Sequence, residues 1–209
     1  MKRSLLYIMC SLALLSCSKS DDAVPNLLTE FCDVHINHDS IAVTATLDNG
    51  TALDIAPQGL KAAARDTTIR SVITYVTDGA MTLVYNNVPA LCQKPTPAAE
   101  LKSTPHDPVK LISIWRGGNY INMVLGEMTT AGGRHEYAFS IDSLRRRILY
   151  TSLIHKQPAE DLPSYTQKRY ASMPLQVEGT EAYDSVSLSI VTYDGTKTFQ
   201  TKHIVGLNL

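Results

Sequence analysis

The sequence lacks an apolar stretch long enough to cross a membrane as a helix. Its main apolar run, from Leu5 to Leu15, covers eleven residues, whereas a membrane-spanning helix needs about 20. We therefore exclude a transmembrane helix at the amino terminus.

Positive charge is also in short supply. The chain has 19 Lys and Arg residues against 20 Asp and Glu residues, a formal net charge of −1. Nucleic-acid-binding domains usually carry a basic patch or stripe, so we expect no nucleic acid partner. The one basic run is Arg145 to Arg147. Such a run more often forms a solvated edge that discourages strand pairing, although guanidinium groups also bind phosphate.

Local signatures of the common enzyme classes are absent as well. The sequence has no G-x-S-x-G elbow, C-x-x-C pair, P-loop or G-x-G-x-x-G motif. His135 and Glu136 open the stretch HEYAF, which lacks the second histidine of a zinc protease helix. A triad of residues distant in sequence would leave no such signature. We therefore predict no enzyme activity and no cofactor, with an uncharacterised hydrolase as the alternative.

The amino terminus has the pattern of a lipoprotein leader. Two basic residues precede the apolar run, which ends in LLSC, residues 14–17, and this stretch resembles the bacterial lipobox. Cleavage before Cys17 would remove residues 1–16 as a signal peptide, and two or more acyl chains on its thiol would give stable attachment. The alternative is a secreted protein that is cut elsewhere. We predict an outer membrane lipoprotein, on the periplasmic face or the cell surface, with residues 17–30 as a lipidated tether.

Few cysteines are left for the folded part of the chain. Of four cysteines, Cys10 lies in the leader and Cys17 carries the lipid, so Cys32 and Cys92 remain. Disulfides persist outside the cytoplasm, and a bridge between these two is one interpretation. Two buried thiols that pack as small hydrophobic groups are the other.

Residues 31–93 have the pattern of a small barrel. Apolar residues alternate with period two between turn signals, which is typical of strands. The predicted strands are 31–37, 41–47, 51–55, 69–77 and 81–85. Asp48-Asn49-Gly50 marks a tight hairpin turn, and residues 58–65, QGLKAAAR, favour a short helix. Three strands, a helix and two strands is the order of an OB-fold barrel.

The remainder of the chain predicts a second β domain. Residues 94–110 contain four prolines and few apolar groups, which indicates an interdomain linker. Strand patterns then occur at 111–115, 120–125, 134–141, 148–154, 186–193 and 196–203. Six strands in residues 111–209 indicate a β-sandwich, with a long loop between His155 and Asp184. The predicted fold class is all-β with one short helix: an N-terminal OB-fold-like barrel followed by a C-terminal β-sandwich.

These features together resemble the NigD-like lipoproteins. The resemblance rests on the lipidated cysteine, on a barrel-like segment with DNG in its second turn, and on DPVKLISIWRGGNYINMVL followed by HEYAFSID and ILYTSLIH. Its most specific residues are Trp115, Gly117, Gly118, Tyr120 and Asn122. The resemblance covers most of the mature chain and implies an OB-like domain followed by a β-sandwich. It supplies no catalytic residues.

The densest group of metal-ligating residue types lies in DVHINHD, which contains Asp33, His35, His38 and Asp39. A metal site needs three or four converging ligands, and this stretch offers a local pair or trio. A polar hairpin turn explains the same residues. We predict no bound metal and keep these four residues as weak candidates.

Aromatic residues are the better candidates for ligand binding. Trp115 with Tyr120 could stack on a sugar ring, although a lone tryptophan on a strand before Gly-Gly more often belongs to the core. Tyr165, Tyr170 and Tyr183 lie in the predicted loop and suit a binding face, because tyrosine supplies contact area at low entropic cost.

We therefore predict a non-catalytic, membrane-anchored lipoprotein that serves as a cell-envelope binding or assembly module for a glycan, a peptide or a partner protein. The alternative is a bacteriocin-associated or immunity lipoprotein, which rests on the family resemblance alone. A hydrolase or metal-dependent enzyme that uses residues 33–39, or a cleft between the domains, is the second alternative.

Overall fold

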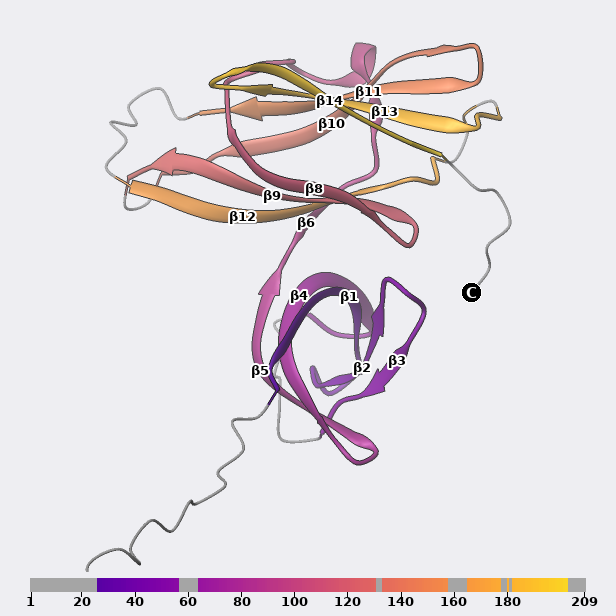
Figure 1. Ribbon diagram of the computed structural model, residues 1–209, viewed down its shortest axis with the longest axis vertical. Coiled ribbons are helices and arrows are strands. Elements are labelled where there is room, and N and C mark those ends of the chain that lie inside the picture. The colour runs from indigo at the N-terminus through magenta and orange to yellow at the C-terminus, as the bar shows by residue number, and fades with distance from the viewer. Residues whose placement is uncertain are drawn as a thin grey trace, which may run out of the picture.

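The computed structural model describes residues 26–56, 64–130, 133–157, 165–177, 180 and 182–202. The strands form a five-stranded sheet from the first part of the chain, and a five-stranded and a four-stranded sheet from the rest. In Figure 1 the first sheet curls into a barrel below two layered sheets. The predicted all-β fold, a barrel followed by a sandwich, is confirmed.

Two sequence predictions fall wholly or mostly outside the described residues. These are the leader with Cys17, and the short helix at 58–65. Within the described ranges, the one helix is the single turn η1 (Ala98–Glu100). In that same part of the chain, no helix has the length and apolar character needed to span a bilayer.

The barrel is built from β1 (Leu28–Ile36), β2 (Ala42–Leu47), β3 (Ala52–Asp54), β4 (Thr67–Asp78) and β5 (Met81–Pro89). These strands lie in the order β3-β2-β1-β4-β5. A parallel bridge between Ile55 and Thr82 joins the two outer edges, and the Ala56 N–H donates to the Thr82 carbonyl over 3.0 Å. The sheet therefore closes in the strand order of an OB-fold.

Alternation along β1 separates the barrel core from the face that meets the sandwich. Cys32 and Val34 are buried in the barrel core. Phe31 and Asp33 point to the opposite side, because successive side chains of a strand alternate between faces. The predicted turn at Asp48-Asn49-Gly50 joins β2 to β3, and Gly50 has a φ of 86°, which glycine adopts readily.

The sandwich consists of two packed sheets. One has the order β6-β12-β9-β8, formed by Leu91–Cys92, Tyr165–Pro174, Tyr120–Thr129 and Lys110–Gly117. The other has the order β14-β13-β11-β10-β7, formed by Gly195–Lys202, Ser185–Thr192, Ile148–Lys156, Glu136–Arg145 and Thr96–Pro97. Fully buried side chains such as Met123, Phe139 and Leu188 fill the space between them.

The proline-rich segment 94–110 runs along the sandwich. Its strand β7 pairs in parallel with β10, and isolated bridges join His106 to His155 and Val109 to Thr192. The segment therefore contributes backbone pairing to the second domain.

The predicted long loop between His155 and Asp184 is wrong, because it contains β12. Every residue of β12 pairs with β9, from Tyr165 opposite Thr129 to Pro174 opposite Tyr120. The first four residues of β12 are exposed, so YTQK shows little of the apolar alternation by which a strand is predicted. Cross-strand pairing stabilises this segment where local propensity does not.

The arginine run forms the turn between β10 and β11. Arg146 and Arg147 have positive φ values of 49° and 61°, a backbone conformation that residues other than glycine seldom adopt. Arg147 forms an exposed ion pair with Asp184 at 2.6 Å. The structure thus places the run on an exposed turn.

Candidate functional site at the domain junction

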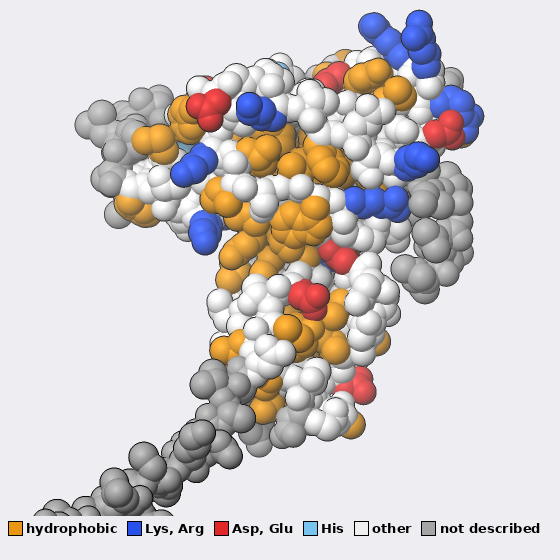
Figure 2. All heavy atoms as spheres, in the orientation of Figure 1, with side chains coloured by type: hydrophobic (Ala, Val, Ile, Leu, Met, Phe, Trp, Pro, Cys, Tyr) orange, Lys and Arg blue, Asp and Glu red, His pale blue; other side chains and the backbone are white. Residues whose placement is uncertain are grey.

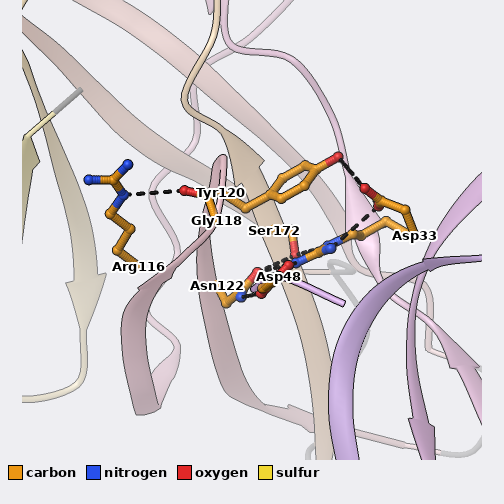
Figure 3. Close-up of polar contacts among 8 residues, drawn as sticks. Asp33, Asp48, Arg116, Gly118, Tyr120, Asn122 and Ser172 are labelled. Carbon is orange, nitrogen blue, oxygen red and sulfur yellow. Dashed lines mark hydrogen bonds and ion pairs between the residues drawn. The ribbon is translucent and has the colours of Figure 1, made fainter. Parts of the chain in front are cut away.

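One buried arginine links the barrel to the sandwich. The side chain of Arg70, on β4, is 2% exposed. Its guanidinium group donates to Asp33 at 3.3 Å and to Asp48 at 2.5 Å within the barrel. It also donates to Asn122 at 3.0 Å and to Ser172 at 3.1 Å in the sandwich. Figure 3 shows the four partners converging from both domains.

Strand register brings these partners together in pairs. Asp33 of β1 lies directly opposite Arg70 of β4, so both side chains project from the same outer face of the barrel. Ser172 of β12 lies opposite Asn122 of β9, on the outer face of a sandwich sheet. The junction is therefore a contact between two cross-strand pairs.

Asp48 completes the network from the turn after β2. Asn122 Nδ2 donates to Asp48 Oδ2 over 2.5 Å, and Ser172 Oγ donates to Asn122 Oδ1 over 2.7 Å. Two carboxylates thus surround one guanidinium, and their charge-assisted hydrogen bonds offset the desolvation cost that an unpaired buried charge would leave uncompensated.

Tyr120 covers the guanidinium from one side. The Arg70 Cζ atom lies 3.9 Å from the centre of the Tyr120 ring, a cation–π contact. The Tyr120 hydroxyl donates to Asp33 over 3.1 Å. Burial raises the pKa of this hydroxyl above its ordinary value, and the nearby Asp33 charge raises it further. Tyr120 therefore acts as a neutral donor within the junction.

Two glycines of the WRGGNY stretch let the domains approach closely. A side-chain carbon at Gly117 would collide with the Asp48 carboxylate, and one at Gly118 would collide with the Asp48 backbone. Gly118 also has a φ of 53°. The close approach therefore requires glycine at both positions.

A cavity of about 680 Å³ lies beside this network and is lined by both domains. The Phe31 ring packs edge-to-face against Trp115 and Tyr170, with centroids 5.4 and 5.8 Å apart. Trp115 is 37% exposed, whereas Phe31 is buried. Glu30 and Arg116 contribute polar groups to the lining. Concave sites with aromatic walls and a few polar groups are typical of ligand binding.

The structure brings part of the predicted binding set together. Trp115 and Tyr170 both line the cavity. The interpretation of Trp115 as sandwich core is wrong, because β8 directs the ring out of the sheet toward the barrel. Tyr120 lies in the adjacent Arg70 network. Tyr165, 48% exposed at the start of β12, is not among the residues that line the cavity.

The prediction of Tyr183 as a surface binding residue is wrong. Its side chain is 4% exposed and belongs to the sandwich core. The Tyr183 hydroxyl donates to the Leu175 carbonyl over 2.5 Å and accepts from the Val177 N–H over 3.0 Å. These two hydrogen bonds attach the segment after β12 to the sandwich core.

The interpretation of Cys32 and Cys92 as a disulfide is also wrong for this structure, in which both are free thiols. Cys32 points into the barrel core, where its exposed fraction is 0%. Cys92 is exposed on β6, which pairs with β12 of the sandwich. The two residues belong to different domains, and Cys32 fits the alternative of a buried thiol.

The candidate metal ligands are not brought together. Asp33 bonds to Arg70, whereas His35, His38 and Asp39 are exposed near the β1–β2 turn. Asn37 closes that turn by accepting from the Asp39 N–H over 3.0 Å. Among the described residues, no group of three His, Cys, Asp or Glu side chains could hold a metal ion.

Sequence reasoning missed Arg70, the residue on which the junction is centred. A signal was present, since Arg70 is the one charged residue in the strand pattern TTIRSVITYV. A charge that interrupts an apolar strand needs partners if it is buried.

A second buried polar network lies inside the sandwich. Glu127, 1% exposed, accepts from the Tyr137 hydroxyl at 2.7 Å and from Arg169 at 2.8 Å. Nearby, His155 Nδ1 donates to the Asp107 carbonyl over 2.9 Å, so its Nε2 accepts from His135 Nδ1, also at 2.9 Å. These contacts join both sandwich sheets and the segment 94–110.

Comparison with known proteins adds evidence about the fold. No protein-family model matches the chain, and no curated protein matches its sequence. A solved structure of a NigD-like immunity protein from Bacteroides caccae matches with a TM-score of 0.66 and 24% identity, over 85% of this chain and 92% of that one.

Two further solved structures share the fold at lower identity. A protein of Parabacteroides distasonis described as toxin-related matches with a TM-score of 0.63 and 15% identity, over 87% of this chain and 95% of that one. A candidate lipoprotein of Bacteroides fragilis matches with a TM-score of 0.59 and 11% identity, over 84% and 96%. The chain thus shares its barrel-and-sandwich fold with a NigD-like immunity protein, which confirms at the level of the fold the resemblance read from the sequence.

Proposed function

We propose that this protein is a non-catalytic lipoprotein that is anchored in the outer membrane through Cys17 and binds an envelope ligand at the domain junction. The ligand is a glycan, a peptide or a segment of a partner protein. The observation that carries the proposal is the cavity of about 680 Å³ between Trp115 and the barrel. In Figure 2 hydrophobic side chains gather where the barrel meets the sandwich, and exposed apolar patches of this kind mark binding surfaces.

The polar groups beside the cavity support binding over catalysis. The carboxylates of Asp33 and Asp48 are both engaged by Arg70, and Asp48 also accepts from Asn122. These bonds hold the two domains together. A general acid or base has to exchange protons with substrate, and these carboxylates are committed to structural partners.

Trp115 is the only tryptophan in the chain, so the tryptophan fluorescence reports on the surroundings of this one residue of the cavity lining. We would titrate residues 18–209 with peptidoglycan fragments, lipopolysaccharide oligosaccharides and extended peptides. A ligand in the cavity should shift the Trp115 emission. Tyr170→Ala should lower the affinity for that ligand by about tenfold or more, because the cavity loses one of its aromatic side chains.

The matched control is Tyr150→Ala, which removes an exposed tyrosine from β11, outside the cavity lining. It should leave the affinity unchanged. Equal affinities for Tyr170→Ala and the unaltered chain would place the ligand elsewhere and reject the junction as its site.

Anchoring is tested separately from ligand binding. Radiolabelled palmitate should mark the natural chain, and Cys17→Ser should abolish both the label and the firm membrane association. An unlabelled natural chain, or a Cys17→Ser chain that stays bound to membranes, would contradict the anchor.

A second candidate function is immunity to a bacteriocin, which the fold likeness to an immunity protein and to a toxin-related protein favours. Deletion of the gene should then raise the sensitivity of the cell to a cognate bacteriocin. Unchanged sensitivity to bacteriocins of neighbouring strains would count against this role.

A further inference from the structure

An edge of the sandwich has the features of a strand-acceptor site. β8 (Lys110–Gly117) is the last strand of its sheet, and within the described ranges its ladder is formed with β9 alone. The outer side of an edge strand presents backbone N–H and C=O groups that have no partner in the sheet. Over eight residues this edge offers a template about 26 Å long.

An apolar groove runs alongside this edge. The groove has a volume of about 420 Å³, and Leu111 and Ile114 of β8 face Ile190 and Phe199 of the opposite sheet across it. Figure 2 shows hydrophobic side chains uncovered in the gap between β14 and β8. The pairing of β8 with β9 is irregular between Leu111 and Ser113, so Leu111 and Ile114 both face the groove although they are three residues apart. A strand added to β8 would place alternate side chains in this groove on either side of that irregularity.

The start of β8 is fixed, so the edge is held in place for pairing. The Val109 N–H donates to the Val191 carbonyl over 3.1 Å, and Val109 forms a parallel bridge with Thr192. The edge of the other sheet differs in composition. β14 has the polar sequence GTKTFQTK with two lysines, the kind of residue that discourages pairing at an edge. β8 also has two basic residues, Lys110 and Arg116, but unlike β14 it exposes the large apolar side chains of Ile112 and Trp115 between them.

Charge at the two ends of β8 argues against a second copy of the chain as the added strand. Lys110 lies at one end and Arg116 near the other. A second β8 in antiparallel register would set Lys110 against Arg116, and like charges directly opposite each other are destabilising. A strand with acidic ends would instead form favourable pairs at both positions.

We propose that β8 accepts an extended strand of a partner protein, apolar at alternate positions and acidic at both ends. This inference goes beyond the proposed function, because the groove and the junction cavity have no lining residue in common. Trp115 and Arg116 of β8 do line the junction cavity, so Tyr170→Ala separates the two proposals: it alters the cavity from β12 and should leave peptide binding along β8 unchanged.

The test uses residues 18–209 and a six-residue synthetic peptide, which alternates valine and threonine between two terminal glutamates. Six residues of β9, Ile121–Gly126, span the distance between Arg116 and Lys110. Binding should slow hydrogen exchange of β8 amides by about tenfold or more, because edge amides gain partners. The same peptide with methylated backbone nitrogens on alternate residues should give no protection, since it cannot donate to the edge.

A charge exchange tests the register of the added strand. Lys110→Glu, at an exposed position, should lower the affinity for the glutamate-ended peptide by about tenfold, because it replaces an attraction by a repulsion. A peptide with one terminal glutamate replaced by lysine should bind Lys110→Glu better than it binds the natural chain.

Three results would overturn the proposal. They are no protection of β8 at millimolar peptide, equal binding of the methylated peptide, and protection of β8 that rises with protein concentration in the absence of peptide. The last result would assign the edge to a second copy of the chain.

Discussion

The backbone of Gly118 lies against the backbone of Asp48, so close that a Cβ atom at position 118 would lie 2.6 Å from the Asp48 carbonyl oxygen. This contact joins the most specific stretch of the resemblance to the hairpin turn of the barrel. It explains why the WRGGNY and DNG stretches occur in the same chain. The two turns are the two halves of one domain contact.

Replacement of Gly118 by alanine should therefore loosen the junction. Gly118→Ala brings both a steric clash with Asp48 and a positive φ of 53°, whereas Gly79→Ala brings a positive φ of 62° with nothing within 4 Å. Gly79→Ala is the control, and it should lose about 1–2 kcal/mol of unfolding free energy because alanine must adopt the left-handed backbone conformation. Thermal unfolding should show a larger loss for Gly118→Ala, and equal losses would contradict the close contact.

Loss of the Arg70 side chain should be more severe. Arg70→Met leaves Asp33 and Asp48 at the junction without their cation, and removal of one partner from a buried ion pair costs about 3–5 kcal/mol. Urea unfolding of residues 18–209 measures this loss. Arg147→Ala breaks an ion pair whose side chains are 59% and 63% exposed, so it should change little. Similar unfolding midpoints for the two variants would reject the central role of Arg70.

Acid should weaken the sandwich through His155. Burial lowers the pKa of His155 below its ordinary value of 6.5. In the folded chain His155 therefore binds a proton less readily than in the unfolded chain. Its contribution to stability is present above about pH 6.5 and is lost as the pH falls below that value, by up to about 1.4 kcal/mol per pH unit.

Comparison with a variant isolates the His155 contribution from other titrating groups. Urea unfolding at about pH 7.5 and about pH 5 should show a smaller pH effect in His155→Gln than in the natural chain. An identical pH effect in both chains would show that His155 is not the group responsible.

The two cysteines of residues 18–209 should differ in reactivity. Burial raises the pKa of the Cys32 thiol to about 12, so almost none of the reactive thiolate exists at neutral pH. Cys92 is exposed. A maleimide reagent should label Cys92 in the native chain, and both residues after denaturation without reductant. Absence of labelling in denaturant would instead reveal a disulfide.

The barrel could be predicted because its signals are local. Alternation along β1 and β2 and the turn at 48–50 identify strands and their connection without knowledge of distant partners. The first half of β12 has no such signal, since its exposed residues do not alternate. Its existence depends on pairing with β9, about 40 residues earlier in the chain.

The functional site was harder to predict because it depends on distant pairs. Tyr170 could be proposed from its residue type, but its position beside Phe31 follows from the docking of two domains. The residue type of Trp115 allows either a binding role or a place in the core, and the choice between them depends on the barrel, whose Phe31 lies against the Trp115 ring. The Arg70 network required knowledge of the register of both sheets.

The contact between Arg70 and Ser172 also constrains when the domain junction can be completed during synthesis of the chain. The two residues are 102 positions apart, so all barrel strands are synthesised before most of the sandwich. Until Asn122 and Ser172 have both been synthesised, the partners available to Arg70 are the carboxylates of Asp33 and Asp48 in its own domain. The final orientation of the two domains can therefore be reached only after residue 172 has been synthesised.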